Sequence, residues 1–395
     1  ARMSGIATSS CPSGSTPETA SRAPQWHVRE VEALDVRCWR RVEVALPDGL
    51  VLLTGRNGAG KTSLVEAVSL GLVGVSPRTS REGEIVRAGA QALFVRLLAQ
   101  TPVTESVREI GYEQGVGRRM RVDEQAVRSV KAFRAHGSVL VFMPDELRSV
   151  KGPPSARRRH IDRAIEGAIP GYADTLASYA AATAQRNALL RRIRAGDGGE
   201  GELDVWDGQV AELGAKVIGA RRQTLAVLSA PFAGYLERLG GGEGGVLLHE
   251  PSPSAVEDVP HDALAEVLLD RLRTTRSRDV AAAQTLSGPH RDDVGIFAGG
   301  GVDLRRLGSQ GEQRTAALAL VLAQRDHLAA ASARPILLLD DALSELDAER
   351  RLRVLDALQG AGQTLVTSAD AEASSLAAHR AQAHLVVESG RLIDG

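Results

Sequence analysis

The chain has 395 residues, of which 43% are hydrophobic and 25% charged, so it has the composition of a globular protein and a length that suits two lobes. Its 48 basic and 49 acidic residues give a formal net charge of −1, and any contact with nucleic acid must therefore use local basic patches. The sequence has no window of about 18 unbroken apolar residues, which argues against a transmembrane span, and its 3% aromatic content argues against a single-strand binder built on base stacking.

The N-terminal segment is rich in Ser, Thr, Pro and Gly and lacks the apolar core of a secretory signal. We therefore expect residues 1–25 to form a disordered leader. The two cysteines, Cys11 and Cys38, make no disulfide framework, which fits a cytoplasmic location.

A phosphate-binding motif follows an apolar strand early in the chain. In LVLLTGRNGAGKTSLVEAV, the pattern G-x-x-x-x-G-K-[ST] lies between a predicted strand and a predicted helix, the context that this motif requires. Backbone N–H groups of the loop would surround the phosphates of ATP, Lys61 would reach the β and γ phosphates, and Thr62 would ligate Mg²⁺. The predicted ATP-binding residues are Gly55, Arg56, Asn57, Gly58, Ala59, Gly60, Lys61, Thr62 and Ser63.

An acidic strand end in PILLLDDALSELD completes this site. Residues 336–339 are all apolar, which is typical of a strand in the middle of a parallel sheet. Asp340 would then hold the Mg²⁺ ion together with Thr62, and Asp341 would orient the attacking water. Lys61 and Asp341 are therefore the predicted catalytic residues.

Lys61 and Asp340 are 279 positions apart, which implies a large insertion. Residues 156–285 read as mostly helical, with two long antiparallel helices separated by the turn DGGEGE and a further helix at 261–276. These helices are too short for an extended coiled coil. We expect an α/β head with a mixed sheet, formed by residues 26–155 and 286–395, and an inserted helical lobe at 156–285.

A second anion site is predicted at LGSQGEQRTAALALVLA, where Ser309-Gln310-Gly311 begins a helix about 30 residues before Asp340. Its place matches the signature motif of ABC-type ATPases, which caps the γ-phosphate bound to a second subunit. The helix behind it is apolar on every side and is expected in the core. The residues expected to contact the ATP of a partner chain are Ser309, Gln310, Gly311, Gln313 and, from SELD, Asp347.

Several segments together resemble the RecF family of bacterial DNA replication and repair proteins, which are ABC/SMC-like ATPases. The resemblance rests on GRNGAGKTSLVEAV, SPRTSREGEIVRAGAQALFVR, VFMPDELRSVKGPPSARRRHIDRAI, LSGPHRDDV, GSQGEQRTAALAL and LLLDDALSELD. The chain departs from the family pattern in its leader, at Pro77 where a histidine is expected, and at Glu312 where a glutamine is expected.

The resemblance implies a DNA-binding ATPase of recombinational repair and the SOS response. It would dimerise with ATP on duplex DNA or on junctions of single- and double-stranded DNA, and slow, DNA-stimulated hydrolysis would release it. RecO and RecR are implied partners in loading RecA. The alternatives are an SMC-like structural chromosome ATPase, opposed by the short helices, and a transporter-type subunit, opposed by the insertion and by Ser368-Ala369-Asp370 in place of a histidine switch.

Three clusters of basic residues are candidates for DNA contacts, although a charge run is more often only a solvated face. They are Arg118, Arg119 and Arg121; Arg148, Lys151, Arg157, Arg158, Arg159 and Arg163; and Arg271, Arg273, Arg276 and Arg278. The second cluster is favoured, because a glycine–proline turn presents its arginines at a helix start and the resemblance covers it. The predicted DNA contacts are Lys151, Arg157, Arg158 and Arg159.

Two other residues are expected to be structural. His290 stands beside Asp292 and Asp293 on a loop, and one histidine with adjacent carboxylates makes a poor metal-ligand set. We expect it to form a hydrogen-bonded corner. Trp39 precedes the phosphate loop and is expected to pack in the core rather than stack on adenine.

Overall fold

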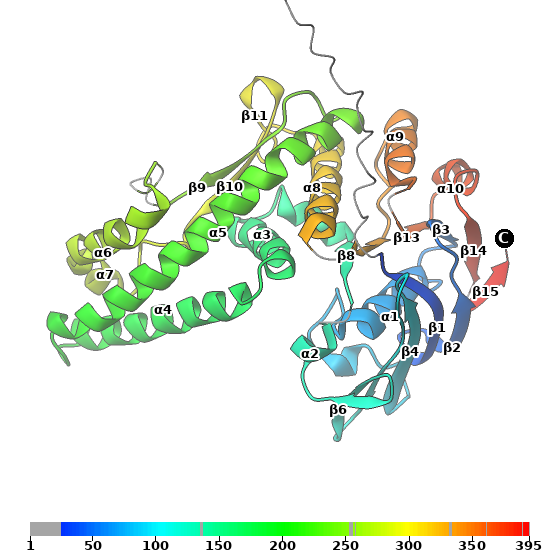
Figure 1. Cartoon of the computed structure of the whole chain (residues 1–395), viewed down its shortest axis with the longest axis horizontal. Coiled ribbons are helices and arrows are strands. Elements are labelled where there is room, and N and C mark those ends of the chain that lie inside the picture. The colour runs from blue at the N-terminus through cyan, green and yellow to red at the C-terminus, as the bar shows by residue number, and fades with distance from the viewer. Residues whose placement is uncertain are drawn as a thin grey trace, which may run out of the picture.

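The chain folds into two lobes that lie side by side in the computed structural model (Figure 1). The structure describes residues 25–134, 137–252, 256, 258–331, 334–360, 362–388 and 390–394. All but the last residue of the expected leader lies outside this range. Within it, no helix is both long and apolar enough to cross a membrane.

A mixed six-stranded sheet forms the centre of the first lobe, in the order β15-β14-β3-β13-β12-β8. All neighbours pair in parallel except β14 and β15, which pair antiparallel. Strand β12 is buried along its whole length, as its apolar sequence predicts. The strands are β3 (Leu50–Thr54), β8 (Val139–Phe142), β12 (Ile336–Leu339), β13 (Thr364–Ser368), β14 (Ala383–Glu388) and β15 (Arg391–Asp394).

A second, antiparallel sheet covers helix α1 (Lys61–Val73) from the other side, in the order β2-β1-β4-β5-β6-β7. Helix α1 is therefore packed between two sheets, and almost all of its residues are buried. The sheet is followed by the short helix α2 (Val130–Arg134). Its strands are β1 (His27–Val36), β2 (Trp39–Ala45), β4 (Ala92–Gln100), β5 (Glu105–Glu113), β6 (Gly117–Val122) and β7 (Gln125–Val127).

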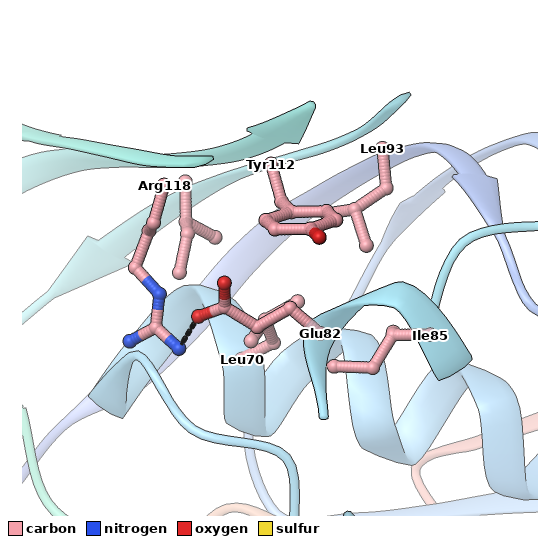
Figure 2. Close-up of a pocket in the computed structure, with 7 residues that line it drawn as sticks. Leu70, Glu82, Ile85, Leu93, Tyr112 and Arg118 are labelled. Atoms are coloured by element: carbon pink, nitrogen blue, oxygen red, sulfur yellow. Dashed lines mark ion pairs between the residues drawn. The ribbon is translucent and has the colours of Figure 1, made fainter. Parts of the chain in front are cut away.

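A cavity of about 10 Å³ remains between α1 and this sheet (Figure 2). The ion pair between Arg118 and Glu82 lies at its edge, and Tyr112 and Leu93 line it. This volume holds roughly one water molecule, so the cavity is a packing gap rather than a ligand site.

The second lobe is built on two long helices that lie side by side, α4 (Tyr172–Arg194) and α5 (Leu203–Arg238), as the sequence predicts. It also contains a three-stranded sheet that the sequence analysis missed, in the order β11-β10-β9. Strand β9 pairs with β10 across the expected boundary between residues 285 and 286. The other elements are α3 (Pro154–Ala168), α6 (Leu264–Thr274), α7 (Arg276–Ala282), β9 (Val246–Glu250), β10 (Asp293–Ala298) and β11 (Val302–Asp303).

Buried charges hold this lobe together. Arg186 of α4 is fully buried between Asp207 of α5 and Asp279 of α7, at 2.7 Å from each carboxylate. His290 contacts the hydroxyl of Tyr179 at 2.6 Å and the carbonyl oxygen of Thr285 at 3.0 Å. This confirms the structural role expected for His290, and burial lowers its pKa.

Helix α8 (Gln310–Ala331) joins the two lobes (Figure 1). It packs against α5 on one side and contacts β8 of the central sheet on the other. Residues 313–325 are buried, which confirms the core helix that the apolar sequence predicts. Helices α9 (Ala348–Leu358) and α10 (Ala371–Ala378) complete the first lobe.

Candidate nucleotide site and its surroundings

The phosphate loop between β3 and α1 is packed so closely that two of its glycines are obligatory. Gly55 has φ 144°, and a Cβ atom there would lie 2.1 Å from the carbonyl oxygen of Val387. Gly60 has φ 121°, and a Cβ atom would lie 2.9 Å from Cys38 Sγ and from Trp39 Nε1. L-residues rarely adopt such φ values, so the glycines of the motif are required by backbone shape as well as by space.

Trp39 fixes this loop through a hydrogen bond. Its indole Nε1 donates to the carbonyl oxygen of Gly60 at 3.0 Å, and the side chain is 1% exposed. The core position expected for Trp39 is confirmed, whereas its contact with the loop was missed. On the other side, the N–H of Gly390 donates to the carbonyl oxygen of Ala59 at 3.0 Å. The loop is therefore held from both sides.

Lys61 lies over the loop that precedes it. Its Nζ donates to the carbonyl oxygens of Gly55 at 2.6 Å and Arg56 at 3.0 Å, and the side chain is buried. Burial lowers its pKa, and the charges of Asp340 and Asp341 act in the opposite direction. The ammonium group is thus placed between the loop and two carboxylates.

Thr62 and Asp340 meet across the cleft. The Thr62 hydroxyl lies 2.9 and 3.0 Å from the two carboxylate oxygens of Asp340, and the Thr367 hydroxyl donates to one of them at 2.7 Å. Burial raises the pKa of Asp340, and the two hydroxyl hydrogen bonds oppose that rise. A hydroxyl and a carboxylate that converge in this way offer only hard oxygen ligands. They fit Mg²⁺, which also takes ligands from a bound phosphate.

Asp341 begins the loop that follows β12, here named the Asp341 loop (residues 341–345). Its φ of 51° is unusual for a residue other than glycine. Its N–H donates to the Thr367 hydroxyl at 2.9 Å, so one threonine orients both neighbouring acids. Asp341 lines the cleft, and a carboxylate there can accept a hydrogen bond from a water molecule.

The cleft has a volume of about 470 Å³ and is rimmed by two arginines that the sequence analysis did not assign, Arg37 and Arg78. Both contact Glu66 of α1, which is fully buried: Arg37 through Nε and Nη2 at 2.8 Å, and Arg78 through Nη1 at 3.3 Å. The signal in the sequence was a single acid within the apolar run SLVEAVSL. The full lining is Arg37, Cys38, Asn57, Gly58, Gly60, Lys61, Thr62, Ser63, Arg78, Pro144, Asp340, Asp341, Thr367 and Ala369.

The first residues of the signature segment are exposed to solvent, and donor groups of Ser309 are bound by a side chain of the same segment. Ser309 and Gln310 are exposed, and Ser309 donates to a Glu312 carboxylate oxygen from its N–H at 2.8 Å and from its hydroxyl at 2.7 Å. These hydrogen bonds lower the pKa of Glu312. Gln313 differs from the expectation: it is 5% exposed, and its side-chain amide donates to the carbonyl oxygen of Leu304 at 2.9 Å. It therefore turns inward and cannot face a partner chain.

Asp347 is exposed at the start of α9, and its side chain accepts the N–H of Arg350 at 2.8 Å. The guanidinium of Arg350 lies beside Gly311, so the two helix starts are neighbours on one surface. This surface is separate from the cleft, because none of the described cleft-lining residues comes from the signature segment.

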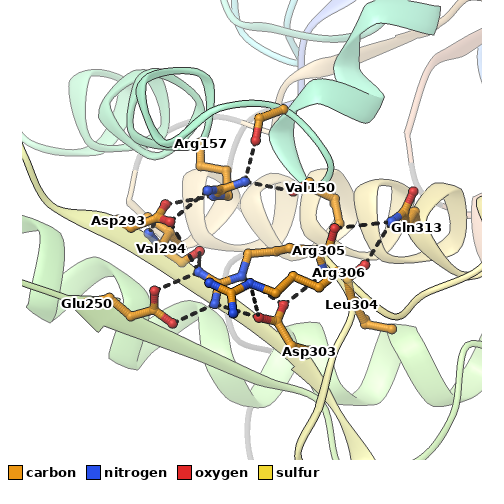
Figure 3. Close-up of polar contacts among 11 residues, drawn as sticks. Val150, Arg157, Glu250, Asp293, Val294, Asp303, Leu304, Arg305, Arg306 and Gln313 are labelled. Carbon is orange, nitrogen blue, oxygen red and sulfur yellow. Dashed lines mark hydrogen bonds and ion pairs between the residues drawn. The ribbon is translucent and has the colours of Figure 1, made fainter.

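The predicted DNA contacts divide into buried and exposed side chains, and Figure 3 shows the contacts of the buried one, Arg157. Arg157 is 7% exposed, and its guanidinium donates to both carboxylate oxygens of Asp293 at 2.7 Å and to the carbonyl oxygens of Val150 and Gly152. Asp293 also accepts a hydrogen bond at 3.3 Å from Arg305, which lies just after β11. The prediction that Arg157 contacts DNA is therefore wrong, because its guanidinium already donates hydrogen bonds inside the lobe.

The other members of this cluster differ among themselves. Arg158 is half-buried and donates to the carbonyl oxygen of Asp292. Lys151 and Arg159 are exposed, as is Arg148, and within the described parts of the chain their side chains form no ion pair. These three cations are free to meet an anionic partner.

The chain is similar to known proteins over nearly its whole length. The RecF/RecN/SMC N terminal domain family matches residues 27–390. The DNA replication and repair protein RecF of Heliobacterium modesticaldum is 33% identical over 88% of this chain and 94% of that protein. The protein with the same description from Chloroflexus aggregans is 36% identical over 93% of this chain and all of that protein.

Solved structures agree with these matches. The structure of the recombination mediator protein RecF-ATPrS in the RecFOR pathway has a TM-score of 0.82 at 27% identity, and covers 95% of this chain and all of that chain. An Smc head bound to the C-winged helix domain of ScpA has a TM-score of 0.58 at 15% identity, covering 93% of this chain and 97% of that one, and so shares the fold. The α/β ATPase head of ABC/SMC type expected from the sequence is confirmed.

Replacing Thr367 by valine tests the link between the two acids. Thr367→Val removes a hydrogen bond to ionised Asp340, so the pKa of Asp340 rises further and its charged, metal-binding form is lost at a higher pH. We expect Mg²⁺-dependent ATP binding, titrated from about pH 8 to about pH 5, to weaken at a higher pH than in the wild type.

Thr364→Val is the matched control, because Thr364 is also buried on β13 but its hydroxyl contacts the carbonyl oxygen of Gly362. If ATP binding by Thr367→Val weakened at the same pH as binding by Thr364→Val and by the wild type, Thr367 would not set the charge of Asp340.

Proposed function

The chain belongs to the RecF family within the RecF/RecN/SMC group, and on this premise we propose that it is an ATP-driven DNA clamp of replication and repair. In this proposal two copies close around two ATP molecules, the closed dimer holds DNA, and hydrolysis opens it. The observation that carries the proposal is the pair of separate surfaces on one chain: a nucleotide cleft, and an exposed signature that does not line that cleft.

ATP binding is assigned to the phosphate loop, residues 55–63. Membership of this family gives the chain an ATP-binding and ATP-hydrolysing type of head, and the RecF-ATP structure, at 28% identity, has a TM-score of 0.79. The glycine geometry supports the assignment, because the positive φ values of Gly55, Gly58 and Gly60 give the loop a curved backbone of the kind that surrounds phosphate groups. Lys61 would exchange its carbonyl partners for phosphate oxygens.

Hydrolysis is assigned to the acids at the end of β12. Thr62 and Asp340 would hold Mg²⁺, which neutralises charge on the β and γ phosphates when it is bound. Asp341 would accept a proton from, or orient, the attacking water. Arg37 and Arg78 add positive charge at the rim, so the cleft suits a highly charged anion.

Dimerisation is assigned to the surface that carries Ser309, Gln310, Gly311 and Asp347. A helix start attracts an anion through its free N–H groups and its dipole. The Ser309 hydroxyl can donate to a γ-phosphate but has none to meet in its own chain, since it lies outside the cleft. A second copy, placed head to head, would supply that phosphate, and ADP would leave the contact unmade.

DNA binding is assigned to the exposed cations Arg148, Lys151 and Arg159. Arg148 belongs to the 3₁₀ helix η2 (Pro144–Ser149), whose first residue, Pro144, lines the nucleotide cleft. A DNA-contacting segment that touches the cleft offers a route by which DNA could stimulate hydrolysis. Contacts to phosphate oxygens give binding without sequence preference.

The proposed place of this clamp in repair is drawn from the description of a relative. A solved relative is described as a recombination mediator of the RecFOR pathway. By that likeness, this protein would act in the cytoplasm with RecO and RecR at duplex DNA or at single/double-strand junctions, and help to load RecA after DNA damage.

The dimer is tested by sedimentation of the purified chain, first with ADP and then with ATP. The wild type should be monomeric with ADP and dimeric with ATP. Lys61→Met removes the cation that meets the phosphates, and Ser309→Arg removes the hydroxyl and fills the signature with a bulky side chain. Both variants should stay monomeric with ATP. A wild type that remains monomeric with ATP at every concentration, with DNA present, would contradict the proposal.

Glu312→Gln should strengthen the ATP-dependent dimer. The carboxylate occupies the donors of Ser309 and would repel a γ-phosphate, whereas glutamine keeps an acceptor without the charge. Removing a repulsion of about 1 to 2 kcal/mol lowers the dimer dissociation constant roughly tenfold. Glu266→Gln, in the first turn of the remote helix α6, is the control and should change nothing. Equal dimerisation of both variants would refute this role of Glu312.

The DNA surface is tested by salt dependence. Lys151→Gln combined with Arg159→Gln should weaken duplex binding and reduce the salt slope by about 2, one for each lost phosphate contact. The control is Arg119→Gln with Arg121→Gln, which removes the same charge from β6, where Arg121 lies opposite Glu109. If the control pair lost affinity and the first pair did not, DNA would bind the antiparallel sheet instead.

A further inference from the structure

Arg314 is a buried arginine that connects the signature helix to the Asp341 loop. It lies on the second turn of α8 and is 4% exposed. Its Nε donates to the carbonyl oxygen of Ala342 at 3.3 Å, its Nη2 donates to that of Asp341, and its Nη1 lies 3.1 Å from a carboxylate oxygen of Glu345. One side chain thus joins a surface predicted to face a partner to the loop predicted to carry the chemistry.

The conformation of the Asp341 loop explains why such a contact is needed. Its first and last residues, Asp341 and Glu345, have φ values of 51° and 61°, a left-handed region that L-residues other than glycine avoid. Arg314 contacts both residues. On the opposite side, Thr367 accepts the N–H of Asp341. The backbone of Asp341 is therefore held at its N–H and at its carbonyl group, which fixes the position and direction in which its side chain leaves the backbone.

We infer that Arg314 is a positioning residue for hydrolysis, which aims Asp341 at the attacking water and couples it to the signature of the same chain. The inference rests on the proposed function, in which Ser309 and Gly311 bind the γ-phosphate held by a second copy. Ser309 immediately precedes α8, and Arg314 lies five residues further on, where the helix is already buried. A shift of the first turn of α8 would therefore move the Arg314 guanidinium and the carbonyl group of Asp341 with it. Each ATP site of the dimer then responds to closure of the other.

A positioning role and a purely structural role differ in what they change. An arginine that only supports the fold would, when replaced, lower stability and weaken ATP binding, dimerisation and hydrolysis together. A positioning residue leaves ATP binding and dimerisation intact and lowers the rate of the chemical step. Displacing a catalytic group by about 1 Å is enough to reduce that step by up to a hundredfold.

Arg314→Lys tests this difference, because lysine keeps the charge but cannot reach three acceptors at once. The matched control is Arg325→Lys, on the same helix and 6% exposed, whose guanidinium contacts Tyr235 and Asp326 instead. The measurements are the dissociation constant of a fluorescent ATP analogue, sedimentation with ATP, and single-turnover hydrolysis. Arg314→Lys should keep the first two within about twofold and lower the third at least about tenfold, while Arg325→Lys should leave all three within about twofold.

Glu345→Ala provides a second variant that does not disturb the core, since the Glu345 side chain is 54% exposed. It removes one of the three partners of Arg314, so hydrolysis should fall by roughly threefold with ATP affinity unchanged. Two covalently linked copies then test in which chain Arg314 acts, because the link replaces the dimerisation that Lys61→Met weakens. With Lys61→Met in one copy, Arg314→Lys should slow hydrolysis when it lies in the ATP-holding copy and not when it lies in the other.

The outcomes separate this inference from the proposal beneath it. If the wild type dimerises and hydrolyses ATP, and Arg314→Lys and Glu345→Ala match its single-turnover rate, the inference is wrong and the proposed function stands. The same holds if ATP affinity, dimerisation and rate all fall together in both variants. A wild type that neither dimerises nor hydrolyses ATP would overturn the proposed function, and this inference with it.

Discussion

The head is arranged around a buried carboxylate that forms no ion pair with the residues that the structure describes. Asp340 is 4% exposed, and within the described part of the chain it is held by the hydroxyl groups of Thr62 and Thr367 rather than by an ion pair. A buried charge of this kind is costly, and its pKa rises unless a cation arrives. The site therefore favours a divalent metal, and it exists only because the fold brings together Thr62 and Asp340, 278 positions apart. The whole second lobe is inserted between these two residues.

The same principle, that a buried charge must find a partner, explains the rim of the cleft. Helix α1 is packed between two sheets, so its Glu66 has no route to solvent and must be neutralised by neighbours. Arg37 and Arg78 supply that charge from two loops, and both therefore end beside the phosphate loop. A requirement of the core thus leaves two cations where a nucleotide would need them. Trp39 likewise has two roles, because its ring fills the core and its indole N–H holds the carbonyl group of Gly60.

Local patterns in the sequence predicted the elements that local physics determines. The apolar run 336–339 became a buried parallel strand, and the run 315–323 became the buried part of a helix. Burial of individual polar side chains was not predictable in this way, because it depends on partners distant in sequence. Arg157 pairs with Asp293, 136 positions away, and Gln313 turns inward to Leu304. The small sheet was missed because β9 is a short segment between helices, and its partner strand lies beyond the expected lobe boundary.

The signature segment shows how the open and closed forms of the clamp would be balanced. In the structure Glu312 satisfies the N–H and the hydroxyl of Ser309, so closure of the proposed clamp would exchange one anion for another instead of filling an empty site. The free energy available from a γ-phosphate is then the difference between the two anions, and only that difference shifts the population toward the dimer. A small difference makes closure reversible, and loss of the γ-phosphate is enough to restore the internal cap. Hydrolysis in such a system would act as a timer for DNA release, because the contact between Glu312 and Ser309 forms again when the dimer opens and offsets the interactions that are lost.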